Sequence, residues 1–133
     1  MTIVNRRRIL LFYFLFVLFL TAGCHKNSTS ISGIGLIIEG CDHSLVITNY
    51  NGSAVHFLLV ERGAAMLIDW YPACKMDAPN RIDPKKSIEI SYEDVHGYFE
   101  QCEIIVYWWF CVKQTGKDEY AYDMIRSEVI QTK

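Results

Sequence analysis

The chain lacks the excess of basic residues that a nucleic-acid-binding protein carries. It holds 13 Lys and Arg against 15 Asp and Glu, a formal net charge of −2 at pH 7. Three of the arginines stand together at Arg6, Arg7 and Arg8, and the 110 residues from position 24 onward carry a formal charge of −5. Such a surface attracts neither a phosphate backbone nor an anionic lipid surface. We therefore expect no nucleic-acid partner.

Recognisable metal and catalytic motifs are also lacking. The cysteines form no Cys-x-x-Cys pair, which argues against a zinc knuckle. Cys41-Asp42-His43 offers three ligand types, with His56 or His96 as further ligands, but no second ligand pair accompanies it. We expect no metal, no cofactor and no enzymatic activity, and we keep an enzyme with a Cys/Asp/His site as a remote alternative.

No apolar run is long enough for a comfortable membrane span. The longest, Ile9 to Leu20, has 12 residues, whereas a spanning helix needs about 20. Arg6 to Arg8 precede this run and small residues follow it, which are the three parts of a secretory signal. An uncleaved N-terminal membrane helix is the alternative.

The segment Leu20-Thr21-Ala22-Gly23-Cys24 resembles the signal of bacterial envelope lipoproteins, although Thr21 stands where Leu is commoner. The resemblance implies cleavage between Gly23 and Cys24, a diacylglyceryl group on the Cys24 sulfur and often an acylated (palmitate-type) amine. Two or more acyl chains give a stable anchor. The expected location is therefore the cell membrane or the outer membrane, facing the periplasm or the exterior, with the lipid bilayer as a partner.

The sequence predicts three segments. Residues 1–23 form the signal peptide, and 24–32 form the lipidated cysteine with a Ser/Thr-rich flexible tether. Residues 33–133 form a single domain, because 110 residues suffice for one domain and not two.

The patterning of this domain predicts an all-β fold. Helical periodicity is poor, and short apolar segments alternate with turn residues at intervals of eight to twelve residues, which favours an antiparallel, immunoglobulin-like β-sandwich of about seven strands. Asn51-Gly52 predicts a hairpin between the strands on either side of it. Pro72, Pro79 and Pro84 place a loop or an edge at 71–84. The expected strands are 36–38, 45–50, 55–61, 66–70, 87–92, 102–112 and a strand or strand pair over 120–130.

Four cysteines besides Cys24 predict disulfides in an exported chain. They are Cys41, Cys74, Cys102 and Cys111, and they allow two bridges with three connectivities. At least one bridge is expected, and the pairing stays open.

Tyr107, Trp108, Trp109 and Phe110 form the one stretch that suggests a binding patch. Four consecutive aromatic residues on a strand place some side chains on each face. One open face would suit a sugar or a protein, whereas core on both faces is the favoured interpretation, as for a central strand.

The sequence thus predicts a non-catalytic envelope lipoprotein with a binding or assembly role and an unidentified protein or glycan partner. A small inhibitor or immunity lipoprotein that blocks an envelope-targeting hydrolase is the first alternative. It would use a protruding loop, for which the proline-rich stretch 71–84 is the candidate.

Overall fold

The computed structural model describes residues 31–33 and 35–133. The predicted signal peptide, residues 1–23, and most of the predicted tether, 24–32, lie outside the described residues, and so do Gly23 and Cys24. The predicted boundaries of the three segments stay predictions.

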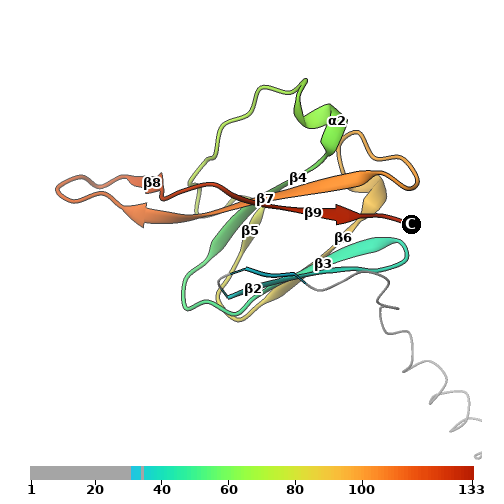
Figure 1. Ribbon diagram of the computed structural model, residues 1–133. Helices are drawn as coiled ribbons and strands as arrows, with labels where there is room; N and C mark the ends of the chain where they lie inside the picture. The colour runs from blue at the N-terminus through green and yellow to red at the C-terminus, as the bar shows by residue number, and fades with distance from the viewer. Residues whose placement is uncertain (1–30, 34) are drawn as a thin grey trace, which may run out of the picture.

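The described residues form two antiparallel sheets (Figure 1). Sheet A has the strand order β1-β2-β3-β6, with β1 (Ile31–Gly33), β2 (Leu36–Gly40), β3 (Ser44–Asn49) and β6 (Ser87–Ser91). Sheet B has the order β5-β4-β7-β8, and β9 also pairs with β7. Its strands are β4 (Val55–Glu61), β5 (Arg81–Ile82), β7 (Glu103–Lys113), β8 (Tyr120–Tyr122) and β9 (Arg126–Gln131).

The prediction of an all-β fold is confirmed. Within the described residues, helix is limited to the single turn α2 (Arg62–Ala65) and the 3-10 turn η1 (Tyr92–Asp94). No helix in residues 31–33 and 35–133 combines the length and the apolar character that crossing a membrane requires.

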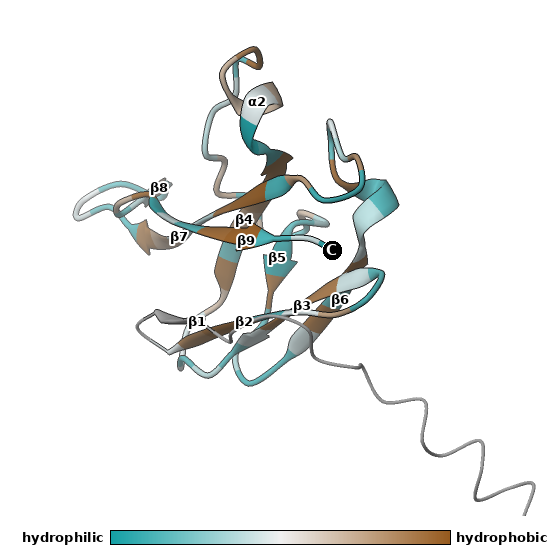
Figure 2. Cartoon of the chain, turned by 45° about the vertical axis from the view of Figure 1, so that its right-hand side comes forward, coloured by the Kyte–Doolittle hydropathy of each residue, from teal (hydrophilic) through white to brown (hydrophobic). Residues whose placement is uncertain are grey.

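The core lies between the two sheets, where the hydrophobic colouring of Figure 2 concentrates on strands. On sheet A, Ile38 pairs with Ile47 and Ile47 with Ile88, which places one aliphatic row across three strands. On sheet B, Phe57 of β4 pairs with Trp108 of β7, and both side chains are buried. The alternation in each strand therefore directs one face into the shared core, as expected for packed sheets.

Strand β7 is central in sheet B, as its two apolar rows predict. It pairs with β4 on one side and with β9 and β8 on the other. Its inward row comprises Ile104, Val106, Trp108 and Phe110, and all four belong to the core cluster or pack against it.

The predicted hairpin at Asn51-Gly52 is wrong. The strands on either side, β3 and β4, belong to different sheets, so this segment carries the chain across the sandwich. The buried Asn49 side chain organises the crossing: its amide donates to the carbonyls of Ser53 and Ile82, and its Oδ1 accepts the Asn51 amide N–H at 2.9 Å. A local turn signal is therefore overridden by a side chain that satisfies several backbone groups at once.

The predicted strand at 66–70 is also wrong, because these residues follow α2 and continue into an irregular loop. Glu61 begins α2 by accepting the backbone N–H groups of Gly63 and Ala64, each at 2.8 Å. These hydrogen bonds hold the pKa of the Glu61 carboxyl below its usual value. The chain turns away from the sheet here and returns at β5.

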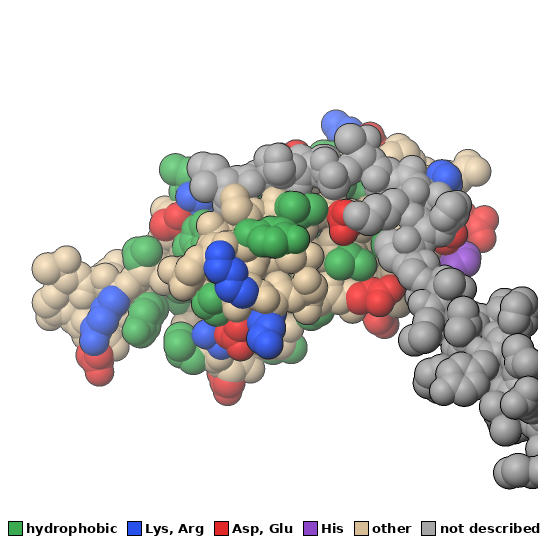
Figure 3. Space-filling view, turned by 90° about the horizontal axis from the view of Figure 1, so that it is seen from below, with side chains coloured by type: hydrophobic (Ala, Val, Ile, Leu, Met, Phe, Trp, Pro, Cys, Tyr) green, Lys and Arg blue, Asp and Glu red, His purple; other side chains and the backbone are tan. Residues whose placement is uncertain are grey.

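Figure 3 shows the molecule from below, on the side of sheet A. Where the surface is not drawn in grey, cationic, anionic and separate hydrophobic side chains are interspersed. The projection at its left edge corresponds to the β7–β8 hairpin at the left of Figure 1.

Candidate binding surface on sheet B

The outer face of sheet B is the candidate functional site, because an irregular loop covers part of it and leaves apolar side chains exposed. We call residues 66–80, between α2 and β5, the covering loop. In Figure 1 this segment rises above α2 and descends to β5. The outward row of β7 beneath it contains Ile105, Tyr107, Trp109 and Cys111.

Tilted aromatic contacts hold the first half of the covering loop against the sheet. The Trp70 ring lies 5.1 Å from the Tyr107 ring and 5.8 Å from the Trp109 ring, measured between centroids. Trp109 is 1% exposed, and its indole N–H donates to the Ala73 carbonyl at 3.2 Å. Trp70 and the loop backbone therefore complete the burial of a tryptophan that points away from the main core.

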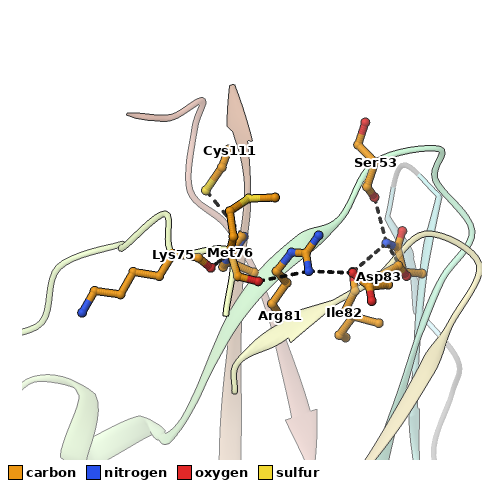
Figure 4. Close-up of polar contacts among 9 residues, drawn as sticks. Ser53, Lys75, Met76, Arg81, Ile82, Asp83 and Cys111 are labelled. Carbon is orange, nitrogen blue, oxygen red and sulfur yellow. Dashed lines mark hydrogen bonds and ion pairs between the residues drawn. The ribbon is translucent and has the colours of Figure 1, made fainter. Parts of the chain in front are cut away.

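A disulfide and a histidine fasten the second half. Cys74 of the loop is bonded to Cys111 of β7. His56 of β4 is 2% exposed, its Nε2 lies 3.0 Å from the Lys75 carbonyl oxygen, and its Nδ1 lies 3.5 Å from the Cys111 sulfur. Figure 4 shows Lys75, Met76 and Cys111 together beside β4, with Arg81 donating to the Met76 carbonyl.

The predicted disulfides are therefore realised in part. The bridge Cys74–Cys111 is present, so the expectation of at least one disulfide is confirmed. Cys102 is a free thiol buried in the core cluster. Cys102 lies directly before β7 and packs between the sheets. A free cysteine is readily buried there because it behaves as a small apolar side chain. Cys41 also belongs to a disulfide.

The predicted patch at 107–110 is divided between the two faces of β7. Trp108 and Phe110 point into the core, and Trp108 is 3% exposed. Tyr107 and Trp109 point outward under the covering loop. The four rings thus do not form one surface, and Tyr107 alone borders the hollow described next.

A shallow hollow of about 590 Å³ lies beside the covering loop, between α2 and the segment that leads into β7. Its apolar lining comes from Met66, Phe99, Ile105 and Tyr107, and its rim carries Glu61, Arg62 and Glu103. Arg62 and Glu103 form an ion pair at 2.6 Å across this rim. The hollow therefore has an apolar floor, and its rim carries one ion pair and the side chain of Glu61.

Large hydrophobic side chains stand exposed around this hollow. Met66 is 83% exposed and Phe99 58%, and both line the hollow, while Leu67, next to Met66 in the chain, is 86% exposed. The predicted strand at 66–70 would bury alternate side chains of this segment. For that reason the sequence analysis does not predict an exposed surface here. A clustered set of exposed apolar side chains marks a site of interaction more often than scattered ones do.

The other candidate site is not assembled in the described residues. Cys41-Asp42-His43 connects β2 to β3 in sheet A, whereas His56 sits in β4 of sheet B against Cys111. In residues 31–33 and 35–133, no group of three or more His, Cys, Asp and Glu side chains is arranged to hold a metal ion.

Comparison of the chain with protein-family models, with curated proteins and with solved structures finds no match in any of the three.

Proposed function

We propose that this chain is an envelope lipoprotein whose β domain is a non-catalytic binding module. The N-terminal sequence supports the anchoring: Arg6 to Arg8, the apolar run Ile9 to Leu20 and the Gly23-Cys24 junction form the order of a lipoprotein signal. Cys24 would carry the acyl chains, and the module would act at a cell membrane or outer membrane surface, outside the cytosol.

The observation that carries the binding role is the exposure of Met66 and Leu67 next to the hollow. These two adjacent apolar side chains are more than four-fifths exposed, so they contribute almost no hydrophobic free energy to folding. They project from a loop that stacking and a disulfide hold in place. A fixed loop loses little conformational entropy on binding, so its exposed side chains retain most of their interaction energy.

The chemistry of this surface favours a protein partner over a glycan. A sugar stacks on an open aromatic face, but Trp109 is buried and Trp70 packs against it. The most exposed side chains at the hollow, Met66 and Leu67, are instead thioether and aliphatic groups that suit an apolar protein surface. The partner would present an apolar side chain to the floor formed by Phe99, Ile105 and Tyr107.

We further propose that the sandwich is immunoglobulin-like. The order β2-β3-β6 in one sheet and β5-β4-β7-β9 in the other parallels strands A-B-E and C′-C-F-G of that architecture. Two features depart from the family: Cys102 is a free thiol, and the buried Tyr92 hydroxyl donates to the distant Cys41 carbonyl rather than to backbone a few residues upstream.

Acylation is tested with Cys24→Ser in the full-length chain, expressed with labelled palmitate. We expect label in the wild-type chain and none in the variant, which should remain unprocessed. Persistence of label in the variant would falsify the lipoprotein proposal. Cys102→Ser, which removes a core thiol, is the matched control and should retain the label.

The cysteine chemistry gives a second, independent check. A sulfur in a thioether to diacylglyceryl cannot also join a disulfide, so acylation of Cys24 requires that Cys24 is not the disulfide partner of Cys41 in the mature protein. Mass spectrometry of the mature, unreduced chain measures both at once. A mature chain with an unmodified Cys24 joined to Cys41 would contradict the anchor.

Binding is tested with a photo-crosslinking residue at position 67 in the native envelope, and with the same residue at position 117 in the distant β7–β8 turn as the control. We expect a discrete crosslinked protein from position 67, lost when Met66→Glu is added. Equal crosslinking from both positions would show that the surface is not selective.

The inhibitor or immunity role is the second candidate function, because a projecting, disulfide-fastened loop is the form that many inhibitors present to an enzyme. The covering loop overlaps the predicted stretch 71–84 in residues 71–80. Lysozyme-type and toxin hydrolases incubated with the domain should lose activity, and Leu67→Glu should restore it. Unchanged activity across such a panel removes this candidate.

A further inference from the structure

The surroundings of the Cys74–Cys111 bond point to a use beyond fastening the loop. Both sulfurs belong to partly exposed residues, and one of them lies against a histidine that is almost completely buried. A structural disulfide needs no such neighbour, since covalent geometry alone holds the two chain segments together.

The hydrogen bonding of His56 fixes which ring nitrogen faces the sulfur. Nε2 lies 3.0 Å from the Lys75 carbonyl oxygen, which only accepts hydrogen bonds, so Nε2 carries the proton. Nδ1 of the neutral ring is then a lone pair, and it lies 3.5 Å from the Cys111 sulfur. The ring is further held by stacking on Trp109, with 6.1 Å between centroids and 17° between planes.

We propose that Cys74 and Cys111 form a thiol–disulfide exchange site in which His56 is the base for Cys111. This inference goes beyond the proposed function and does not depend on it. The co-reactant is a thiol or disulfide of the glutathione type, or the cysteine pair of an exchange protein.

In the oxidising direction, the Cys74 thiolate first attacks one sulfur of the co-reactant's disulfide, whose S–S bond breaks and whose other sulfur leaves as a thiolate. The product is a mixed disulfide between Cys74 and the co-reactant. The Cys111 thiol gives its proton to Nδ1 of His56, and the resulting thiolate attacks the Cys74 sulfur. The new S–S bond forms as the bond to the co-reactant breaks, and the co-reactant leaves as a thiolate. His56 then holds one proton on each nitrogen, and the Nε2–H bond to the Lys75 carbonyl is preserved throughout.

In the reducing direction, an external thiolate attacks the Cys74 sulfur and Cys111 leaves with the bonding electron pair. The Nδ1 proton of a protonated His56 stabilises that leaving thiolate, and a stabilised leaving group departs faster. The site therefore predicts an order of events: the adduct forms on Cys74, in the loop, and Cys111, on the strand, is the resolving thiol.

The buried position of His56 supports this role over a purely packing one. A buried imidazole must satisfy its polar atoms. Here Nε2 donates to a carbonyl, whereas Nδ1 faces a disulfide sulfur that has no proton to donate and gains a donor only when Cys111 is a thiol. The Nδ1 lone pair is therefore an internal base placed at Cys111.

The test follows oxidation of the fully reduced, full-length chain by glutathione disulfide at pH 7, quenched with iodoacetamide and resolved by peptide mass spectrometry. The wild-type chain should close the 74–111 bond with little adduct. His56→Gln should slow closure by at least about tenfold and accumulate glutathione on Cys74. His43→Gln, at an exposed histidine in sheet A, is the control and should match the wild type.

Equal closure rates in the wild type and His56→Gln would overturn the proposal. If His56→Gln does not fold, Cys74→Ser provides the alternative, because it leaves Cys111 and His56 in place. Iodoacetamide should then label Cys111 faster in the folded chain than in the same chain in urea, and a rate that is equal or slower overturns the assignment.

Discussion

The two tryptophans on opposite faces of β7 are buried to the same extent by different means. Trp108, on the inner face, is 3% exposed, and it packs into a core that many strand residues share. Trp109, on the outer face, is 1% exposed, but Trp70 and the backbone of the covering loop supply much of its cover. The inner face is therefore buried by packed sheets, and the outer face by a few individual links to one irregular loop.

This difference matters because a core of packed strands and a fastened loop respond differently to change. Loss of one core side chain affects all the strands around it, since the surrounding residues relax only partly. Loss of one link to the loop opens a local segment and leaves the sheets in place. The covering loop can therefore change its conformation while the sheets stay folded. The exposed apolar residues Met66 and Leu67 lie on this loop.

The largest expected effect contrasts the two tryptophans. Trp108→Ala should lower the free energy of unfolding by about 3–5 kcal/mol, because the cavity is enclosed by both sheets. Trp109→Ala should cost about 2–3 kcal/mol, because the covering loop can settle into the space. Urea denaturation measures both, and hydrogen exchange should show faster exchange in residues 66–80 only for Trp109→Ala. The reverse order would contradict the distinction between the faces.

Removing the disulfide with Cys74→Ala and Cys111→Ala together is expected to lower the free energy of unfolding by about 3–4 kcal/mol. The bond joins residues 37 positions apart, and a crosslink of that length restricts the unfolded chain by about this amount. Denaturant titration measures the loss. Cys102→Ala, which removes a free core thiol, controls for the change of side chain and should cost less.

How far the sequence predicts this arrangement also differs between the two faces. Two apolar rows in 102–112 predict a central strand, and the pairing of β7 on both sides confirms it. The inner cover follows from the alternation of apolar and polar residues in the neighbouring strands. The outer cover does not, because 66–80 has no periodic pattern and its contacts depend on Trp70, Ala73 and Cys74 meeting residues far away in sequence.

The wrong predictions share this cause. Asn51-Gly52 is a strong local hairpin signal, but the hydrogen bonds of Asn49 to the 82–83 backbone carry the chain to the second sheet instead. The pairing of Cys74 with Cys111 could not be chosen among three connectivities, because the choice depends on where the loop lies. Long-range contacts of single side chains, rather than periodic patterns, decided each case.

Substitution of Gly97, which packs against α2 in the segment before β7, is expected to have a smaller effect on stability. Gly97 has φ +82°, and a Cβ there would lie 2.6 Å from the Cβ of Ala64. Gly97→Ala should therefore lower the free energy of unfolding by about 1–3 kcal/mol and displace α2 at the border of the hollow. Gly116→Ala is the matched control, since Gly116 has φ +79° with nothing within 4 Å of the added Cβ. It should cost only about 1 kcal/mol for the backbone conformation, and thermal unfolding of the two variants isolates the cost of the contact.

The smallest expected effect concerns Tyr92, a buried tyrosine that follows β6 and contacts the residue after β2. The buried Tyr92 hydroxyl donates to the Cys41 carbonyl at 3.0 Å, so Tyr92→Phe should cost about 1 kcal/mol at pH 7. Burial raises the pKa of Tyr92 above its ordinary value of 10.0, against the lowering effect of the Cys41 hydrogen bond. Burial also raises the pKa of Tyr98, whose ring stacks on that of Tyr92 at 5.5 Å.

The direction of the pH dependence follows from these raised values. Above pH 10 the unfolded chain loses the tyrosine protons while the folded chain still holds them, so the unfolded state binds fewer protons and stability falls as the pH rises. Below pH 10 the contribution is fully present. Urea titrations from pH 8 to pH 11 should therefore show a steeper loss of stability in the wild-type chain than in Tyr92→Phe. Tyr120→Phe, at an exposed tyrosine, is the control and should show the same slope as the wild type. Identical slopes in the wild type and Tyr92→Phe would show that this hydroxyl titrates as it does in the unfolded chain. The end of the sandwich would then be open to water, in contrast to the enclosed inner face of β7.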